Sequence, residues 1–250
     1  MVSSGSAKNP GGQVEKVHGN IAIESLDNSN ALIIRAPGDV WRSLSTVIHK
    51  LDEIDGGVIS SYNDSKVIGN YNNSGFTLHL NNLGNHDFIY ISFDLYIHGS
   101  WDGNSNGFNL KDHGIEDQPD LWIMDLRPEM VNFQSLDFQR FQTTFSNSPC
   151  FPTYCLKQSY PNSFPFTNNP KSSAQEINLT ENCVSPGWNN QKTSLYKIEK
   201  GFDHSGDALI IRFHDKLFQP NAINAQGESI AKCDESWSMD NIKIRVIAYD

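Results

Sequence analysis

An acidic block near the C-terminus contains the residues whose types and spacing point most clearly to chemistry. Asp234, Glu235 and Asp240 run directly into an alternating stretch in which Ile242 and Ile244 share one face. Because Asp240 precedes Ile242 by two residues, the pattern predicts that its carboxylate lies on this apolar face. A charge at the edge of a core is destabilising unless a cation, a basic side chain or N–H groups neutralise it. The block is therefore a candidate calcium site.

A second candidate site is the loop that follows the longest strand-like stretch of the chain. Asp102, Asn104 and Asn106 occupy every second position of this loop, and Asp120 lies a little further along. Alternating oxygen-bearing side chains suit Ca²⁺, which takes roughly six to eight oxygen ligands. We expect these two acidic groups to form one calcium site or two. The alternative is that the loop side chains only cap the loop backbone.

Residues 88–98 alternate between two kinds of side chain. One face is apolar, with Ile89, Ile91, Phe93, Leu95 and Ile97. The other face carries Tyr90, Ser92, Asp94, Tyr96 and His98. Tyrosine rings beside hydrogen-bonding groups can stack on sugars and bind their hydroxyls, so Tyr90, Asp94, Tyr96 and His98, with Trp101, are predicted to bind carbohydrate. The alternative is a solvated outer face, or one covered by long loops.

The elements that must position these residues are strands. Period-two patterns predict eight of them, at Ala31–Arg35, Phe76–Leu80, Phe88–His98, Leu121–Leu126, Phe141–Phe145, Ser194–Ile198, Ala208–Phe213 and Asn241–Tyr249. The best helix candidate is Trp41–Leu51. Strands at this spacing without intervening helices predict an all-β fold, an antiparallel β-sandwich of jelly-roll type. We expect a single domain over residues 13–250, preceded by a flexible lead at residues 1–12.

The cysteines and sequons favour a secreted or cell-surface glycoprotein. Cys150, Cys155, Cys183 and Cys233 are an even set without metal-site spacing. Two disulfides are favoured over four free thiols, and the simplest of the three connectivities pairs Cys150 with Cys155 and Cys183 with Cys233. Candidate glycosylation sites are Asn63, Asn72 and Asn178.

Charge and hydropathy exclude two classes of partner. With 29 acidic and 19 basic residues, the formal charge is −10, which argues against nucleic acid. No stretch of the sequence is apolar for long enough to predict membrane insertion.

We predict that the chain is not an enzyme. It has no Gly-x-Ser-x-Gly elbow, His-Glu-x-x-His motif or phosphate-binding loop. Asp234 and Glu235 are adjacent, so an extended chain would point them to opposite faces, which makes a poor acid–base pair. A glycoside-active enzyme is a less favoured alternative.

The sequence also resembles a known kind of domain. The residues that carry the resemblance are the blocks Ser92–Ile97, Ser100–Asn104, Pro119–Trp122, Thr143–Asn147, Gln158–Pro161 and Asp234–Asn241. In this order they resemble a domain of secreted and cell-surface multidomain proteins, and more distantly MAM-type and laminin-G-like jelly rolls. The resemblance implies a non-catalytic, lectin-like or adhesive extracellular module, often with calcium. Its partner would be a glycan or a cell-surface or matrix protein. The alternative is a self-associating structural subunit of a surface filament or sheath.

Overall fold

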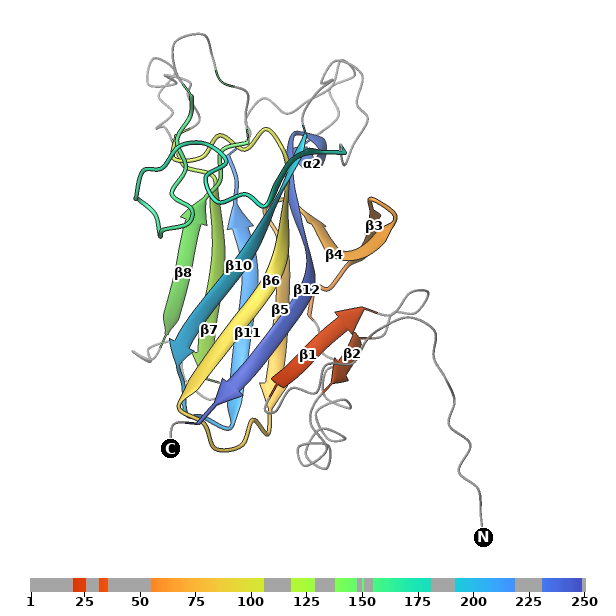
Figure 1. Cartoon of the computed structure of the whole chain (residues 1–250), viewed down its shortest axis with the longest axis vertical. Helices are drawn as coiled ribbons and strands as arrows, with labels where there is room; N and C mark the ends of the chain where they lie inside the picture. The colour runs from red at the N-terminus through yellow and green to blue at the C-terminus, as the bar shows by residue number, and fades with distance from the viewer. Residues whose placement is uncertain are drawn as a thin grey trace.

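The computed structural model describes residues 20–25, 32–35, 55–105, 118–128, 138–147, 150, 155–180, 192–218 and 231–248, the first two ranges as backbone only. These residues form two β-sheets that lie face to face, as Figure 1 shows. One short helix, α2 (Ala231–Asp234), is present among the described residues.

Eight strands form the larger sheet. Its order is β2 (Leu32–Arg35), β1 (Asn20–Ser25), β12 (Glu235–Ile247), β6 (Phe88–Gly99), β10 (Thr193–Asp203) and β9 (Glu176–Leu179), while β4 (Ser65–Tyr71) pairs with both β12 and β3 (Ile59–Tyr62). The smaller sheet has the order β5 (Gly75–Asn81), β11 (Ala208–Lys216), β7 (Leu121–Pro128) and β8 (Gln139–Thr144). Neighbouring strands are antiparallel throughout. The predicted antiparallel β-sandwich of jelly-roll type is therefore confirmed.

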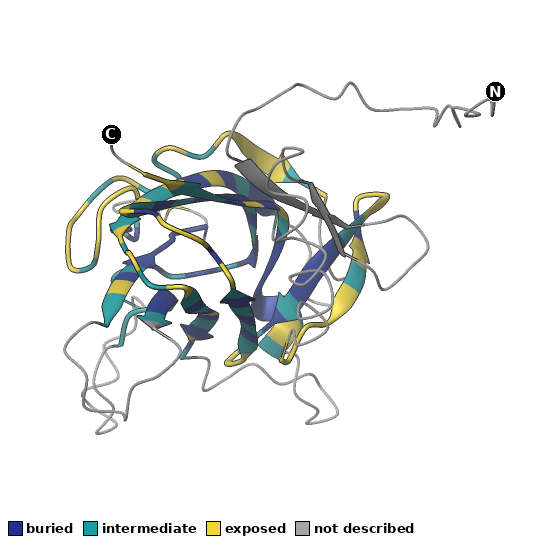
Figure 2. Ribbon diagram, turned by 90° about the horizontal axis from the view of Figure 1, so that it is seen from below, coloured by how far each residue is buried: buried dark blue, intermediate teal, exposed yellow. Residues whose placement is uncertain are grey.

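The central strand β6 separates the core from the outer surface as its alternation predicts. Its inward side chains are all fully buried, namely Ile89, Ile91, Phe93, Leu95 and Ile97. Figure 2 shows buried and more exposed residues alternating along the strands of the two layers. The sheets therefore enclose one apolar core, because each places one face of its strands against the other.

An aromatic cluster joins the two sheets through Trp237 of β12. Its ring centroid lies 4.8 Å from that of Tyr71, 6.0 Å from that of Trp122 and 6.3 Å from that of Phe76. Tyr71 comes from the larger sheet, whereas Trp122 and Phe76 come from the smaller one. Burial of these rings is a large contribution to the free energy of folding.

A bulge in β12 makes the prediction for Asp240 wrong. The register with β6 shifts just after Asp240, so that β12 contains one extra residue, and Asn241 has a φ of 53°. Met239 before the bulge and Ile242 after it are both buried. Asp240 consequently faces outward, opposite Asp94, and not towards the core.

All eight predicted strands are present, and four further strands were missed. The missed ones are β1, β3, β4 and β9. Strands β3 and β4 form a hairpin whose two turn residues, Asn63 and Asp64, have φ values of 49° and 62°. This is the left-handed geometry of a two-residue hairpin turn, so Asn63-Asp64 was the available signal. The predicted helix Trp41–Leu51 and the predicted lead at residues 1–12 lie outside the described residues.

No helix within the described ranges is long and apolar enough to span a membrane.

The aromatic cluster leads to a stability prediction. Replacement of fully buried Trp237 by Ala should lower the free energy of unfolding by about 3 to 5 kcal/mol, because it leaves a cavity between the sheets. Chemical denaturation measures this change. Lys243→Ala, an exposed substitution in the same strand, should change it by less than about 0.5 kcal/mol. Equal effects of the two substitutions would contradict the assigned packing of β12.

Candidate functional site

Three carboxylates meet at the ends of β6, β7 and β12. These strand ends lie at the end of the sandwich that carries α2, which is the top of Figure 1. Asp102 follows β6, Asp120 immediately precedes β7, and Glu235 is the first residue of β12. One carboxylate oxygen from each residue lies within 4.8 Å of the others. Asp120 and Glu235 are fully buried, and Asp102 is partly buried. Because β6 and β12 belong to one sheet and β7 to the other, this carboxylate cluster links the two layers.

Two glycines shape the loop that carries Asp102. Gly99 has a φ of 84°, and a Cβ placed there would lie 1.9 Å from the carbonyl oxygen of Asp234. Gly103 has a φ of 82°, and a Cβ there would lie 2.2 Å from the carbonyl oxygen of Lys157. A residue with a side chain could adopt neither conformation without moving the neighbouring backbone. The close approach of these segments therefore positions Asp102 beside the other two carboxylates.

The two fully buried carboxylates of the cluster differ in the hydrogen bonds that they accept. Asp120 accepts hydrogen bonds from the backbone N–H groups of Asp102, at 2.8 Å, and Phe218, at 3.3 Å. Neither oxygen of Glu235 accepts a hydrogen bond from a donor group in the described ranges. A buried carboxylate without a donor is strongly destabilised as an anion.

Burial and mutual repulsion change how the cluster titrates. Burial raises the pKa of Asp120 to about 7, despite the two backbone hydrogen bonds. Burial, followed by the charges of Asp120, Asp102 and Asp234, raises the pKa of Glu235 well above its ordinary value. Burial and mutual repulsion therefore favour the protonated forms of Asp120 and Glu235.

The cluster combines members of both predicted calcium groups. Asp102 and Asp120 come from the loop group and Glu235 from the C-terminal block, so members of both groups meet in one cluster of the described residues. Asp234 lies nearby and accepts a hydrogen bond from the Ser100 hydroxyl at 2.8 Å.

Other predicted calcium ligands are placed elsewhere. Asp240 is on the outer face of the larger sheet, where its backbone pairs with β6. The side-chain oxygen of Asn104 accepts hydrogen bonds from the hydroxyls of Thr144 and Ser159, so this side chain joins the loop to two other segments of the chain. Asn106 lies outside the described residues.

Three of the predicted carbohydrate-binding residues lie partly exposed on the outer face of β6. Tyr90, Asp94 and Tyr96 share this face and are flanked by β10 and β12. Asp94 accepts a hydrogen bond from the side chain of Asn241 at 2.7 Å, and the guanidinium of Arg245 lies 5.8 Å from the centroid of the Tyr90 ring. Burial, then the charges of Asp240 and Asp94, raises the pKa of Tyr96 to about 12, so its hydroxyl remains a donor at neutral pH.

His98 and Trp101 are corrections, because both are buried. His98 is 2% exposed and contacts Thr193 at 2.9 Å and Ser238 at 2.5 Å through its two ring nitrogens. Burial lowers the pKa of His98 to about 3, which keeps the ring neutral. Trp101 is fully buried and donates its indole N–H to the carbonyl of Ser236 at 3.0 Å. Neither side chain is available to a ligand.

Tyr62 of the β3–β4 hairpin covers the part of this face near the C-terminal end of β6. Its ring centroid lies 4.7 Å from that of His98 and 5.2 Å from that of Tyr96. Its hydroxyl donates a hydrogen bond to the carbonyl of Thr180 at 2.7 Å. The hairpin thus closes over His98 and packs against the ring of Tyr96, which remains partly exposed.

The structure also places most of the cysteines and the sequons. Cys150 and Cys155 form a disulfide, and Cys233 is disulfide-bonded, whereas Cys183 lies outside the described residues. Asn63 and Asn178 are exposed. Asn72 is partly buried and donates a hydrogen bond from its side-chain amide to the carbonyl of Glu235 at 2.8 Å.

Comparisons with known proteins add little to this description. No family model and no curated protein matches the chain. Among solved structures, the CBM22-1 xylan-binding domain of Xyn10C from Paenibacillus barcinonensis aligns with a TM-score of 0.32 and 9% identity, covering 78% of this chain and 84% of that domain. The fold described above rests on the strand pairing of this chain and not on that similarity.

The carboxylate cluster leads to a prediction about pH. In EDTA, Asp120→Asn should stabilise the protein relative to the wild type, and increasingly so as the pH rises from about 4 to about 7. In this range the wild-type folded state retains a proton that the unfolded state loses, because the pKa of Asp120 rises from 3.8 to about 7 on folding. The free energy of unfolding then falls by about 1.4 kcal/mol per pH unit for each such proton.

Denaturation curves of both proteins across this pH range test the prediction. His98 contributes a loss of stability as the pH falls below 6.5, but it does so equally in both proteins. Parallel pH profiles of the wild type and the variant would contradict a proton held at Asp120.

Proposed function

We propose that the protein is an extracellular, non-catalytic module that binds carbohydrate through the outer face of its larger sheet. The observation that supports this most is the placement of Tyr90 and Tyr96 on one face of the central strand, both partly exposed, with Asp94 between them. A β-strand rises about 3.4 Å per residue, so the two rings are about 20 Å apart along it. This separation suits an extended oligosaccharide of several sugar rings.

The chemistry of this face also suits sugars. Tyrosine rings supply apolar surfaces for the C–H faces of sugar rings, and rigid strands limit the entropy lost on binding. The neighbouring β10 and β12 contribute Lys197 and Lys243, whose exposed side chains can hydrogen-bond hydroxyl groups. Arg245 already lies beside Tyr90. The face therefore alternates apolar platforms with polar groups.

A non-catalytic role is supported by where the carboxylates lie. Asp120 and Glu235 have the raised pKa values expected of general acids, but both are fully buried between the ends of the sheets. Buried side chains of this kind are not exposed to a substrate at the surface. An extracellular setting is supported by the disulfide Cys150–Cys155 and by the exposed sequon residues Asn63 and Asn178.

A structural subunit of a filament or sheath is the second candidate. The observation that favours it is exposed apolar surface near the margins of the larger sheet, on β9 and β3. Ile177 of β9 is 50% exposed and Ile59 of β3 is 39% exposed. Such strands can pair with another copy of the chain. The partner would then be a protein, not a glycan.

We further propose that the carboxylate cluster of Asp102, Asp120 and Glu235 binds Ca²⁺. Three carboxylates that converge, one of them with both oxygens buried and without a hydrogen-bond donor in the described ranges, match the oxygen ligands that Ca²⁺ takes. A bound cation would remove the repulsion within the cluster and hold the end of β6 to the starts of β7 and β12. Its role would be to stabilise the fold.

The calcium proposal predicts a change in thermal stability. At a hundredfold excess over its dissociation constant, Ca²⁺ should stabilise the protein by about 2.7 kcal/mol, which corresponds to a rise in melting temperature of roughly 5 to 10 °C over EDTA. Glu235→Gln should abolish this rise, whereas Asp240→Asn, on the outer face, should retain it. A melting temperature indifferent to calcium and EDTA would count against the site.

The carbohydrate proposal predicts binding on a glycan array. Tyr90→Ala and Tyr96→Ala should each weaken binding by about tenfold or more, because each removes a stacking platform. Tyr90→Phe keeps the ring and should retain most of the affinity. A blank array together with ordered self-association would favour the structural subunit. Hydrolysis of an arrayed glycan would show that the protein is an enzyme.

A further inference from the structure

The outer face of the smaller sheet carries a group of charged residues that the sequence analysis did not identify. Strand pairing places Arg212 of β11, Asp125 of β7 and Arg140 of β8 in one row across the sheet. Arg127 and His214 lie on the same face, two residues along their strands. We call these five residues the Asp125 cluster.

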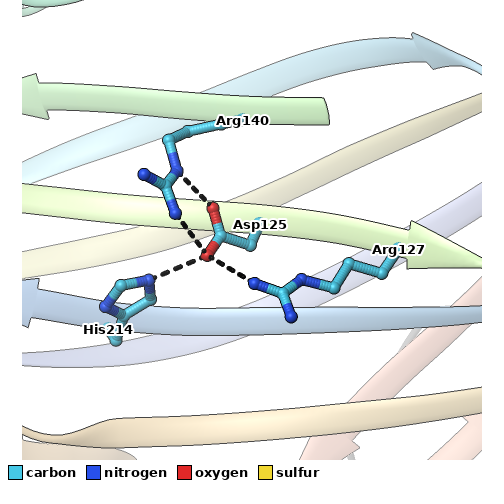
Figure 3. A network of polar contacts seen from close by, with 4 residues as sticks. All are labelled: Asp125, Arg127, Arg140 and His214. Carbon is cyan, nitrogen blue, oxygen red and sulfur yellow. Dashed lines mark hydrogen bonds and ion pairs between the residues drawn. The ribbon is translucent and has the colours of Figure 1, made fainter. Parts of the chain in front are cut away.

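Asp125 is the centre of the cluster, as Figure 3 shows. Its side chain is 1% exposed and accepts two hydrogen bonds from the Arg140 guanidinium, at 2.7 and 3.1 Å. The ring of His214 lies 3.0 Å from it, and Arg127 lies 4.0 Å away. Burial alone would raise the pKa of Asp125, but His214 and Arg140 outweigh it and the pKa is lowered. Asp125 is therefore ionised at neutral pH.

The cluster contains more positive charge than Asp125 can neutralise. The guanidinium groups of Arg140 and Arg127 lie within 4.0 Å of this single carboxylate, and Arg212 is the residue opposite Asp125 on the neighbouring strand. Arg212 is exposed and makes no ion pair with any residue in the described ranges. Among the described residues, Asp55 lies in the same row at the edge of the sheet, beside Thr77 of β5. The excess is notable because the whole chain has a formal charge of −10.

Stacking on an aromatic ring restricts two of the three arginines. The guanidinium groups of Arg127 and Arg140 lie 4.9 and 4.8 Å from the centroid of the Phe138 ring. Arg127 and Arg212 are diagonal neighbours on adjacent strands, a relation that separates Cβ atoms by about 7 to 8 Å. One anion could therefore contact both side chains. Because the Phe138 stacking restricts Arg127, less conformational entropy would be lost on binding.

We propose that the Asp125 cluster binds the carboxylate groups of an acidic polysaccharide built from uronic acids. Planar carboxylates match the arginine fork, and Arg140 already forms such a pair with Asp125. Ile210 and Phe138 are partly exposed beside the arginines and offer apolar contacts for sugar rings. A nucleic acid suits the face less well, since its dense phosphates would be repelled by the acidic remainder of the chain.

This proposal deepens the carbohydrate-binding function by naming an acidic ligand, but it places that ligand on the opposite sheet from Tyr90 and Tyr96. The experiment is calorimetric titration of the full chain with oligogalacturonate at low salt. Fully methyl-esterified oligogalacturonate is the control ligand, because it has the same sugar backbone but no carboxylate charges. We expect binding of the acid and not of the ester, and a marked loss of affinity when salt is raised to about 0.3 M.

Two variants locate the binding surface. Arg127→Gln combined with Arg212→Gln should weaken oligogalacturonate binding by at least about tenfold, because two charge-assisted contacts are lost. Lys157→Gln removes an exposed cation that belongs to neither proposed binding surface and should leave the affinity within about twofold. Thermal unfolding of the double variant, with an unchanged melting temperature expected, checks that it is folded.

Several results would overturn the proposal. These are no binding of oligogalacturonate, equal binding of the methyl ester, or an unchanged affinity in the double variant. Binding of a sulfated glycan or a DNA oligonucleotide without binding of oligogalacturonate would identify another anion instead. Tyr90→Ala separates this proposal from the one above, since it should weaken binding of array glycans and leave oligogalacturonate binding unchanged.

Discussion

The two-residue period of the central strand pair is the constraint on which the rest of the structure depends. Strands β6 and β12 must place apolar side chains inward along their full length, and a shift of one residue would turn Trp237 and Met239 outward. The bulge at Asn241 prevents this, since its left-handed conformation absorbs one extra residue and returns Ile242 to the core. Because the bulge keeps the same residues facing inward on both sides of it, the polar side chains of β12 remain on the outer face of the larger sheet.

At the end of the sandwich that carries α2, the cost of burying carboxylates is set against the binding of protons or a cation. Strand ends from both sheets bring Asp102, Asp120 and Glu235 together, and two glycines permit the close approach. Without a cation, the burial of these carboxylates opposes folding, and protons must compensate. The same burial makes the cluster attractive to a hard cation. The stability of the fold and the affinity for a cation therefore both depend on the charges of Asp120 and Glu235.

The two outer faces present different chemistry. The larger sheet combines partly exposed tyrosines with charged residues of both signs, and Tyr62 covers its upper part. The smaller sheet carries three arginines on the same face as one buried carboxylate. A module with such faces could hold neutral and acidic parts of a glycan-rich matrix at the same time. If one matrix molecule bound both faces at once, its overall affinity would exceed its affinity for either face alone.

The sequence by itself determined the strands of the core and the fold class. Alternation of period two is local, so β6 and the strands at residues 76–80, 121–126 and 208–213 could be recognised without knowing their partners. The sequence also identified Asp102, Asp120 and Glu235 as candidates for one chemistry. Their convergence could not be predicted, because it depends on which strand ends meet. Burial of His98 and Trp101 required the β3–β4 hairpin and the loop contacts, and the outward turn of Asp240 required the bulge. The Asp125 cluster also could not be predicted from the sequence. Its residues are separated in sequence by as much as 89 positions and become neighbours only through strand pairing.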